Sequence, residues 1–479
     1  MPDSSNTQLV VIGGGPGGYA AAFLAADLGM KVALVDEEVN PGGVCLYRGC
    51  IPSKALLHAV RVLTEAREAA HFGIEFQPPK IDVNRLRTWK EEVIAKLTGG
   101  LGQISKQRHV EYIRGRATLV DAHTVSIATK GPSGSQGAGE RPLSFEHAIL
   151  ATGSFPAMLP GLPKSPRIMD STGALDLADI PKTLLVVGGG YIGLELGTVY
   201  AALGTQVSVV EMLDGLLPGA DRDLVSPLAK RIDKIFHEVM LSTKVAEMKE
   251  VKDGLEVKFE GAVGDGRVQT YERVLISVGR KPSSAIPGLE KTRVERDAKG
   301  FIKVDLQRHT AEPSIFAIGD VAGEPMLAHK AMHEGRLTSE AIHGKKVAFE
   351  PRAIPAVVFT DPEVAWCGLT ETQAAQENRP VKVARFPWGA SGRAATLDRT
   401  DGVTKLLIDP ETERVLGVGI TGVGAGDLIA EGVLAVEMSA LAADVALSIH
   451  PHPTLSETVM EAAEVFYGTA TDIYRPKKN

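Results

Sequence analysis

The sequence contains few cysteines: three among 479 residues, of which only Cys45 and Cys50 stand close together. So low a number excludes a secreted scaffold that depends on several disulfides. Positive charge is not in excess, because 52 Lys and Arg stand against 59 Asp and Glu, for a formal net charge of -7. We therefore expect no general attraction to nucleic acid or to an anionic membrane.

Long apolar runs are also missing. No stretch approaches the roughly 20 residues that a membrane-spanning helix needs, and the polar residues 1–7 show no signal or transit pattern. Hydrophobic residues make up 44% and charged residues 23% of the chain, which is a globular balance. A chain of 479 residues is too long for one core, so we expect about three or four domains.

The two neighbouring cysteines lie in the segment GGVCLYRGCIPSK, residues 42–54. In a regular helix, five positions turn two side chains about 140° apart and separate them by roughly 7.5 Å along the axis. A disulfide needs a closer approach, so the segment must be distorted. Gly42, Gly43 and Gly49 permit such a distortion, and Pro52 suits the first turn of a following helix.

This segment predicts a redox-active pair. A helix N-terminus and the nearby Lys54 would both favour the thiolate form of Cys50. The alternatives are two unrelated buried cysteines or half of a zinc site, but zinc would need further close ligands, and Cys367 is distant in sequence. We therefore expect Cys45 and Cys50 to cycle between disulfide and dithiol, without a metal, in a reducing compartment such as the cytoplasm.

A dinucleotide-binding signature occurs twice. Each copy is an apolar strand, the pattern GxGxxG, a helix and a second strand that ends in an acid, which together predict a turn for a pyrophosphate and a carboxylate for ribose hydroxyls. The spacing agrees, since 188 - 13 and 211 - 36 both give 175. The first copy contains Gly13, Gly15, Gly18 and Asp36, and the second contains Gly188, Gly190, Gly193 and Glu211.

The residues after Glu211 indicate which nucleotide the second copy binds. They are Met212, Leu213 and Asp214, with no arginine or lysine to meet a 2′-phosphate, so NAD is favoured over NADP. The alternative is that Glu211 is a plain solvated strand end. Two nucleotide cofactors beside a dithiol imply an electron relay between them.

Three further short strands, predicted over 145–150, 274–278 and 315–318, run into glycine-containing ends. The third ends at Gly319-Asp320, where a carboxylate can face a cofactor hydroxyl. Residues 130–140, rich in Gly, Ser and Pro, predict an exposed loop. From about residue 351 the pattern changes to that of a separate α+β unit.

A candidate base stands near the C-terminal end, in HPHPTLSE, residues 450–457. Thiol chemistry needs a base that titrates near neutrality, and His452 oriented by the carboxylate of Glu457 meets that need. The alternative is a pair of turn histidines with Glu457 as a helix-start acid. We expect His450 to be structural.

GGVC followed by GCIPSK, together with the later HxHPTxxE, resembles the pyridine nucleotide disulfide oxidoreductases, and within them the dihydrolipoamide dehydrogenases. The resemblance covers residues 10 to about 468. It implies an α/β fold with two Rossmann-like dinucleotide-binding domains, for FAD and NAD, and a C-terminal α+β dimerisation domain. The implied bounds are 1–154 and 282–350 for the two parts of the FAD domain, 155–281 for the NAD domain and 351–479 for the interface domain.

The same resemblance implies a set of cofactor contacts. Lys54 is expected near flavin N5, paired with Glu195, and Tyr191 occupies the position of a tyrosine that covers the nicotinamide pocket in glutathione reductase. The FAD set is Gly13, Gly15, Gly18, Asp36, Gly43, Gly115, Thr152, Gly153, Ser154, Asp320 and Ala328. The NAD set is Gly188, Gly190, Tyr191, Gly193, Glu211, Val245 and Gly279.

The resemblance also implies an activity. Dihydrolipoamide carried by the acyltransferase subunit of a 2-oxo acid dehydrogenase complex, or by a glycine cleavage carrier protein, would exchange through Cys45, with Cys50 against the flavin and NAD+ as final acceptor. His452 and Glu457 would come from the other subunit of a homodimer. The alternative is an NAD(P)H-dependent reductase of another disulfide such as glutathione. Tyr47-Arg48 stands where Asn-Val or a similar pair is usual.

Overall fold

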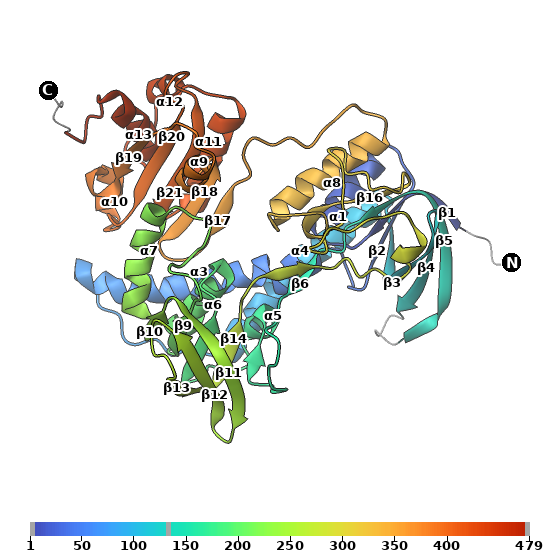
Figure 1. Ribbon diagram of the computed structural model, residues 1–479, viewed down its shortest axis with the longest axis horizontal. Coiled ribbons are helices and arrows are strands. Elements are labelled where there is room, and N and C mark those ends of the chain that lie inside the picture. Colours follow the sequence, from blue (N-terminus) through green and yellow to red (C-terminus); the bar gives the residue numbers. More distant parts are fainter. Residues whose placement is uncertain (1–4, 131–135, 475–479) are drawn as a thin grey trace.

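The computed structural model describes residues 5–130 and 136–474. Three sheet-centred units are visible in Figure 1: the first nucleotide unit in blue, cyan and yellow, the second in green, and a C-terminal unit in orange and red. The predicted fold class is confirmed, since two parallel-sheet units are followed by an α+β unit. No helix within the described ranges is both long and apolar enough to cross a bilayer.

The first unit is built on a parallel sheet in the order β3, β2, β1, β5, β16. Its central strands are apolar on both faces, as a sheet covered on both sides requires. The bounds are Ser5–Ile12 for β1, Val32–Asp36 for β2, Glu111–Asp121 for β3, Gln136–Leu150 for β5 and Ile315–Ala317 for β16. Helices α1 (Pro16–Asp27) and α8 (Ala328–Ile342) pack tightly together, because a Cβ on Gly335 would lie 2.3 Å from the Gly17 carbonyl oxygen.

The prediction of a loop over residues 130–140 is wrong for residues 136–140, which belong to a strand. Strand β4 (Thr124–Lys130) pairs antiparallel with both β3 and β5, and β5 already begins at Gln136. The pairing continues along the hairpin because backbone hydrogen bonds do not depend on the Gly-rich composition of this stretch. Residues 131–135 of the predicted loop lie outside the described residues.

The second unit repeats the arrangement, with the parallel order β10, β9, β8, β14, β7. Three antiparallel strands, β11, β12 and β13, cover one face of this sheet. The bounds are Ile168–Met169 for β7, Thr183–Val187 for β8, Gln206–Val210 for β9, Glu238–Met240 for β10, Thr243–Val251 for β11, Gly254–Gly261 for β12, Val268–Tyr271 for β13 and Arg273–Ile276 for β14. Its helices are α5 (Ser171–Leu175), α6 (Tyr191–Ala202) and α7 (Arg222–Ile235).

The two connections between the nucleotide units pair with each other. Strand β6 (Ser154–Pro156) runs antiparallel to β15 (Arg280–Pro282). The proposed boundaries after residues 154 and 281 both lie in this ribbon, and they remain a proposal.

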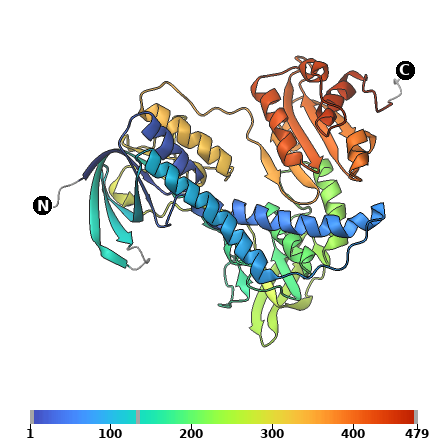
Figure 2. The ribbon, with the colours of Figure 1, turned by 180° about the vertical axis from the view of Figure 1, so that it is seen from behind.

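Two long helices bridge the nucleotide units. In Figure 2, which views the molecule from behind, α3 (Cys50–Glu68) and α4 (Val83–Gln107) lie at the front. Leu56, Leu57 and Val60 of α3 belong to the hydrophobic core of the second unit. Helix α3 therefore starts at the first nucleotide unit and packs on the second.

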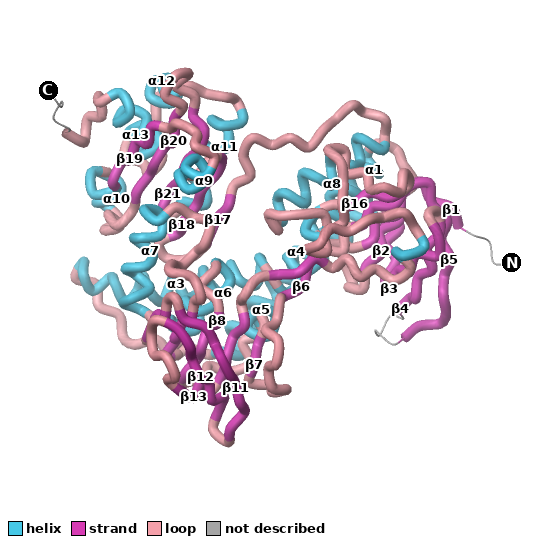
Figure 3. Tube along the Cα trace, viewed as in Figure 1, coloured by secondary structure: helices cyan, strands magenta, loops and turns pink. Residues whose placement is uncertain are grey.

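The C-terminal unit is an antiparallel sheet in the order β17, β18, β21, β20, β19. An extended segment, pink in Figure 3, leads into it from the end of α8 at Ile342 to the start of β17 at Ala356. The strands are Ala356–Val358 (β17), Glu363–Gly368 (β18), Lys382–Pro387 (β19), Val403–Ile408 (β20) and Val415–Gly422 (β21). The helices are α9 (Glu371–Gln376), α10 (Gly392–Thr396), α11 (Ala425–Glu437), α12 (Ala442–Leu447) and α13 (Glu457–Tyr467).

A buried ionic cluster joins this unit to the second nucleotide unit. The Lys405 ammonium, 1% exposed, donates to Asp221 at 2.7 Å, Asp223 at 2.7 Å and Glu371 at 2.6 Å. Among the described residues these carboxylates form the one group arranged to hold a metal ion, and the ammonium stands at its centre. Burial alone would raise the pKa of Asp221, but the hydrogen bond from Lys405 holds that pKa below its ordinary value.

Replacing Lys405 with Met should destabilise the protein by about 3–5 kcal/mol at neutral pH, because the buried Asp221 carboxylate is left without a counter-charge, whereas Asp223 and Glu371 keep their ion pairs with Arg385. The loss should shrink as the pH falls and Asp221 takes up a proton. Chemical unfolding at several pH values measures both effects. Lys244→Met is the matched control, since Lys244 pairs with Glu260 in an exposed setting; equal losses for the two variants would contradict the assignment.

Candidate active site

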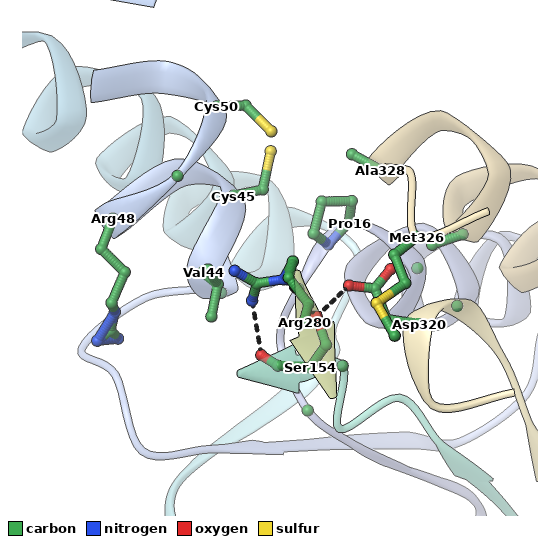
Figure 4. Close-up of a pocket in the computed structure, with 18 of the residues that line it drawn as sticks. Pro16, Val44, Cys45, Arg48, Cys50, Ser154, Arg280, Asp320, Met326 and Ala328 are labelled. Carbon is green, nitrogen blue, oxygen red and sulfur yellow. Dashed lines mark hydrogen bonds between the residues drawn. The ribbon is translucent and has the colours of Figure 1, made fainter. Parts of the chain in front are cut away.

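A cleft of about 370 Å³ lies where the two nucleotide units meet α2 (Gly43–Arg48) and α3. Figure 4 shows the cysteine pair on one side of it and Asp320, Met326 and Ala328 on the other. The lining comes from segments that are far apart in the sequence. They are residues 13–17, 36–38, 43–45, 48–50, 53–54, 151–154, 171, 175, 191–192, 195–196, 280, 318–320, 326, 328 and 331.

The first glycine loop has the shape of a pyrophosphate-binding turn: Gly13 and Gly18 have no room for a side chain, and the space beside Gly15 is open. Gly13 has φ +108°, and a Cβ there would lie 2.3 Å from the Ala151 carbonyl oxygen. A Cβ on Gly18 would lie 1.8 Å from the Gly13 carbonyl oxygen, so this glycine serves helix–strand packing. In the second loop, Gly188 has the same geometry as Gly13, with φ +107°. A Cβ on Gly193 would clash with the Gly188 carbonyl oxygen, just as one on Gly18 would clash with that of Gly13.

The two predicted acids hold their loops in the same way. Asp36 accepts a hydrogen bond from Gly14 N–H at 2.5 Å, and Glu211 accepts one from Gly189 N–H at 2.6 Å. The second oxygens accept from Glu38 N–H and Leu213 N–H, at 2.9 and 2.8 Å. Each carboxylate thus stands at the end of its second strand, beside its glycine loop.

The redox segment is pressed against the first loop. Gly43, the first residue of α2, has φ +56°, and a Cβ there would lie 2.5 Å from the Gly15 Cα. Gly49 separates α2 from α3, and a Cβ on it would lie 2.8 Å from the Val44 carbonyl oxygen. The predicted distortion is therefore a break between two helices, with one cysteine on each side of it.

Cys45 and Cys50 are free thiols whose sulfurs point toward each other in Figure 4. The hydrogen bond from Cys45 lowers the pKa of Cys50 to about 7, against the effect of burial and with help from the Lys54 charge. The same hydrogen bond, together with burial, raises the pKa of Cys45. In the dithiol state, Cys50 is the sulfur that carries negative charge near neutral pH.

Lys54 and Glu195 form the expected ion pair, with 2.8 Å between Nζ and Oε2. Glu195 is 3% exposed, and its Oε2 also accepts a hydrogen bond from the Ser53 hydroxyl at 2.9 Å. Its other oxygen accepts from Phe359 N–H at 3.0 Å. Both oxygens of this buried carboxylate are therefore satisfied, as burial requires.

Arg280 is a lining residue that sequence reasoning missed. Its Nε donates to the Ser154 hydroxyl at 2.7 Å and its Nη2 to the Ser154 carbonyl at 2.8 Å. Ser154 in turn donates to Asp320 at 2.5 Å (Figure 4). The signal available in the sequence was its place directly after Gly279, at the end of a strand.

Several predicted residues lie outside this cleft lining. Gly115 is in β3, one residue after Arg114, which pairs with Asp36. Val245 lies in β11, and Gly279 follows β14, both in the second unit. Their cofactor roles remain proposals.

The histidine pair lies on the C-terminal unit. His452, with a side chain that is 78% exposed, has its Nδ1 2.8 Å from Glu457 Oε1. Glu457 Oε2 accepts from Thr454 N–H at 2.7 Å. His450 uses both ring nitrogens, one toward Ser448 and one toward Glu431. No histidine is among the described residues that line the cleft, so one chain does not bring His452 to the cysteines.

Tyr47 and Arg48, the unusual pair between the cysteines, turn to the loop that follows Asp36. The Tyr47 hydroxyl contacts the backbone N–H and carbonyl of Asn40 at 3.2 and 3.1 Å. Arg48 forms an ion pair with Glu38 and points away from the sulfurs in Figure 4. These side chains brace α2 and leave the face of the cysteine pair open.

Two dinucleotide-binding units with a dithiol between them define a flavin- and nicotinamide-dependent disulfide oxidoreductase. Residues 7–335 match the family described as Pyridine nucleotide-disulphide oxidoreductase, and residues 354–463 match its dimerisation domain. The chain belongs to this family.

Its relatives and structural neighbours fall in the same class. Curated proteins named Dihydrolipoyl dehydrogenase from Vibrio parahaemolyticus and Haemophilus influenzae are each 47% identical over 478 residues, covering 100% of this chain and 99% and 98% of theirs. The crystal structure of LpdA from Mycobacterium tuberculosis superposes with a TM-score of 0.87 at 26% identity, covering 96% of this chain and 99% of that one. A Cu(II) complex of the flavoprotein disulfide reductase RclA from Escherichia coli superposes with a TM-score of 0.84 at 26% identity, covering 96% and 99%.

Gly43→Ala should weaken FAD binding by at least about tenfold, because the methyl group forces α2 away from the Gly15 loop. Titration of the apoprotein with FAD, followed by flavin fluorescence, measures this. Gly73→Ala is the matched control, since Gly73 has φ +81° but open space around a Cβ. It carries the same backbone strain, so an equal loss of FAD affinity in both variants would show that the contact with Gly15 does not matter.

Proposed function

We propose that the chain is a dihydrolipoyl dehydrogenase, which oxidises protein-bound dihydrolipoamide and reduces NAD+. The observation that carries this is the Cys45/Cys50 pair at the junction of two nucleotide units. Curated relatives of that name, 42–47% identical over nearly the full length, support it.

The cleft fits FAD by its shape and its hydrogen-bond acceptors. The glycine loop has no side chains where a pyrophosphate would lie, Asp36 offers a carboxylate to ribose hydroxyls, and Asp320 offers another further along. When bound, FAD accepts two electrons from a dithiol and passes them on to NAD+.

The sulfur chemistry uses residues of this chain. A substrate thiolate attacks Cys45 Sγ of the Cys45–Cys50 disulfide, a mixed disulfide forms, and Cys50 leaves as a thiolate. The second substrate thiol then displaces Cys45, so the substrate dithiol becomes a disulfide as the protein disulfide becomes a dithiol. Lys54 lies one helical turn after Cys50 on α3, and its charge lowers the pKa of Cys50 and so favours the departing thiolate.

His452 of the partner subunit takes the proton of the attacking substrate thiol, and the proton of the second substrate thiol passes to Cys45 as that sulfur leaves. Glu457 accepts from the Nδ1 side of the ring at 2.8 Å, which leaves Nε2 to act as base. The need for a partner follows from the place of His452 outside the cleft and from its exposure.

An apolar surface supports a homodimer. It lies on α11, α12 and the segment just before His450, and includes Leu447, 82% exposed, and Ile449, 98% exposed, with Leu434 and Met438. Exposed apolar side chains gathered in this way are typical of subunit interfaces. The matched dimerisation domain includes this surface.

The second nucleotide unit is suited to NAD. Met212 and Leu213 are exposed after Glu211, and Arg222 donates to the carbonyls of Leu216, Leu217 and Ala220, so its guanidinium is already engaged. A 2′-phosphate would meet the Glu211 carboxylate instead.

The physiological partner we propose is a lipoyl-carrying protein, either the acyltransferase subunit of a 2-oxo acid dehydrogenase complex or a glycine cleavage carrier protein. We propose the cytoplasm as its location, since a redox pair of this kind works where thiols are otherwise kept reduced. Steady-state assays of lipoamide against glutathione, with NADH against NADPH, test the function as a whole: preference for glutathione and NADPH would overturn it.

His452→Gln should slow lipoamide-dependent turnover by about 10²–10⁴-fold, because the general base is lost, and should leave NADH oxidation by an artificial acceptor nearly unchanged. Stopped-flow and steady-state rates measure the two. His71→Gln is the matched control, because His71 is an exposed histidine facing Asp398. Parallel losses in both reactions would remove His452 from the role of base.

The double variant Glu211→Ala, Met212→Arg should lower the preference for NAD(H) over NADP(H) by about 100-fold, because it removes a repelling carboxylate and adds a charge-assisted donor. The ratio of kcat/KM for the two nucleotides measures it. Glu211→Ala, Met212→Leu is the control for loss of the acid alone. An unchanged ratio would show that the nucleotide ribose lies elsewhere.

A further inference from the structure

Phe359 contacts both members of the Lys54–Glu195 pair from a third unit of the fold. It is the first residue after β17, in the C-terminal unit. The Lys54 ammonium lies 4.5 Å from the centroid of its ring, and its backbone N–H donates to Glu195 Oε1 at 3.0 Å. Phe359 is not among the residues that line the cleft, so it acts on the site only through these two neighbours.

We propose that Phe359 is a positioning residue that holds the Lys54 ammonium beside Cys50. This inference rests on the proposed function, in which Cys50 is the thiolate of the reduced pair. It adds a residue of the dimerisation domain to the machinery of the dithiol.

The ion pair with Glu195 does not fix Lys54 by itself. Lysine has a flexible stem and a strongly hydrated charge, and the Lys54 side chain is 31% exposed although Glu195 is buried, so water competes with the carboxylate for the ammonium. Ser53 also donates to the same carboxylate oxygen. The face of an aromatic ring attracts an ammonium electrostatically. The Phe359 ring therefore gives the Lys54 ammonium a second attractive contact besides the Glu195 carboxylate.

The position of the ammonium matters because two opposite charges act on Cys50. The Lys54 charge lowers the pKa of Cys50 and the Glu195 charge raises it. If the ammonium turned away into solvent, the buried carboxylate would remain and would disfavour the thiolate. A ring that keeps the ammonium in place therefore favours the thiolate of Cys50.

The origin of Phe359 links this effect to the C-terminal unit. Strand β17 pairs with β18, Val357 with Ala365, inside the sheet of that unit. Phe359 therefore reaches the site on a strand that is held by the dimerisation sheet. The alternative hypothesis is that the Phe359 ring only fills space in the protein interior. The two hypotheses predict different pH titrations for a variant that lacks both Lys54 and Phe359.

The test uses the reduced FAD holoenzyme, whose long-wavelength charge-transfer absorbance reports the Cys50 thiolate. The absorbance is measured as a function of pH in the absence of oxygen. On the acid side of the wild-type midpoint, the Cys50 thiolate-to-thiol ratio in Phe359→Leu should be about threefold to tenfold lower than in the wild type. Phe359→Tyr keeps a ring face and should match the wild type. Phe466→Leu is the matched control, since the Phe466 ring also carries a lysine ammonium, that of Lys382, at 5.3 Å.

The double variant Lys54→Met, Phe359→Leu decides between positioning and packing. If the ring acts through the ammonium, Phe359→Leu has no further effect on the titration once Lys54 is Met. A wild-type midpoint in Phe359→Leu, or the same shift in the Lys54→Met background, would overturn the inference. Absence of the absorbance band in the wild type would instead overturn the proposed function, so the two failures are distinguishable.

Discussion

The buried carboxylate of Glu195 is the contact on which the arrangement of the three units depends. It lies on α6 of the second unit and accepts hydrogen bonds from Ser53 and from Lys54 on α3, and from Phe359 of the C-terminal unit. A carboxylate removed from water is tolerated only with its partners in place. Any movement of one unit that broke these bonds would leave the charge unpaired, so the units are held in the relative positions that form the cleft.

A second constraint is the lack of space between the redox segment and the first glycine loop. Gly43 and Gly15 bring α2 into backbone contact with the loop that would cradle a pyrophosphate. Tyr47 and Arg48 then tie the far end of α2 to the loop after Asp36. The cysteine pair is therefore held close against the glycine loop on one side and the loop after Asp36 on the other.

The site is nonetheless incomplete in one chain. The sulfurs, Lys54 and Glu195 come together in the cleft, while His452 and Glu457 lie on the C-terminal unit, with the exposed apolar surface around Leu447 and Ile449 just before them in the chain. In the function we propose, assembly of a dimer supplies the base and covers this surface. The same C-terminal unit also contacts the Lys54–Glu195 pair through Phe359.

The sequence by itself determined the two nucleotide units, the cysteine pair and the His452–Glu457 pair, because each is written in residues close together along the chain. The repeat at 175 residues, 13 to 188 and 36 to 211, reappears as the same order of four parallel strands and the same hydrogen bonds from loop to acid, since a strand, a turn and a helix are local structures. The loop predicted over residues 136–140 was wrong, because a Gly-rich composition does not reveal whether the backbone pairs within a hairpin.

Only the tertiary structure decided which distant residues meet, at the site and between the units. Ser154 and Arg280 are 126 positions apart, Glu195 and Phe359 are 164, and Asp221 and Lys405 are 184. No periodicity or spacing predicts such contacts, because they follow from how the sheets and bridging helices pack as whole bodies. The same packing directs Tyr47 and Arg48 away from the sulfurs, where the sequence showed only a bulky and a charged residue between two cysteines.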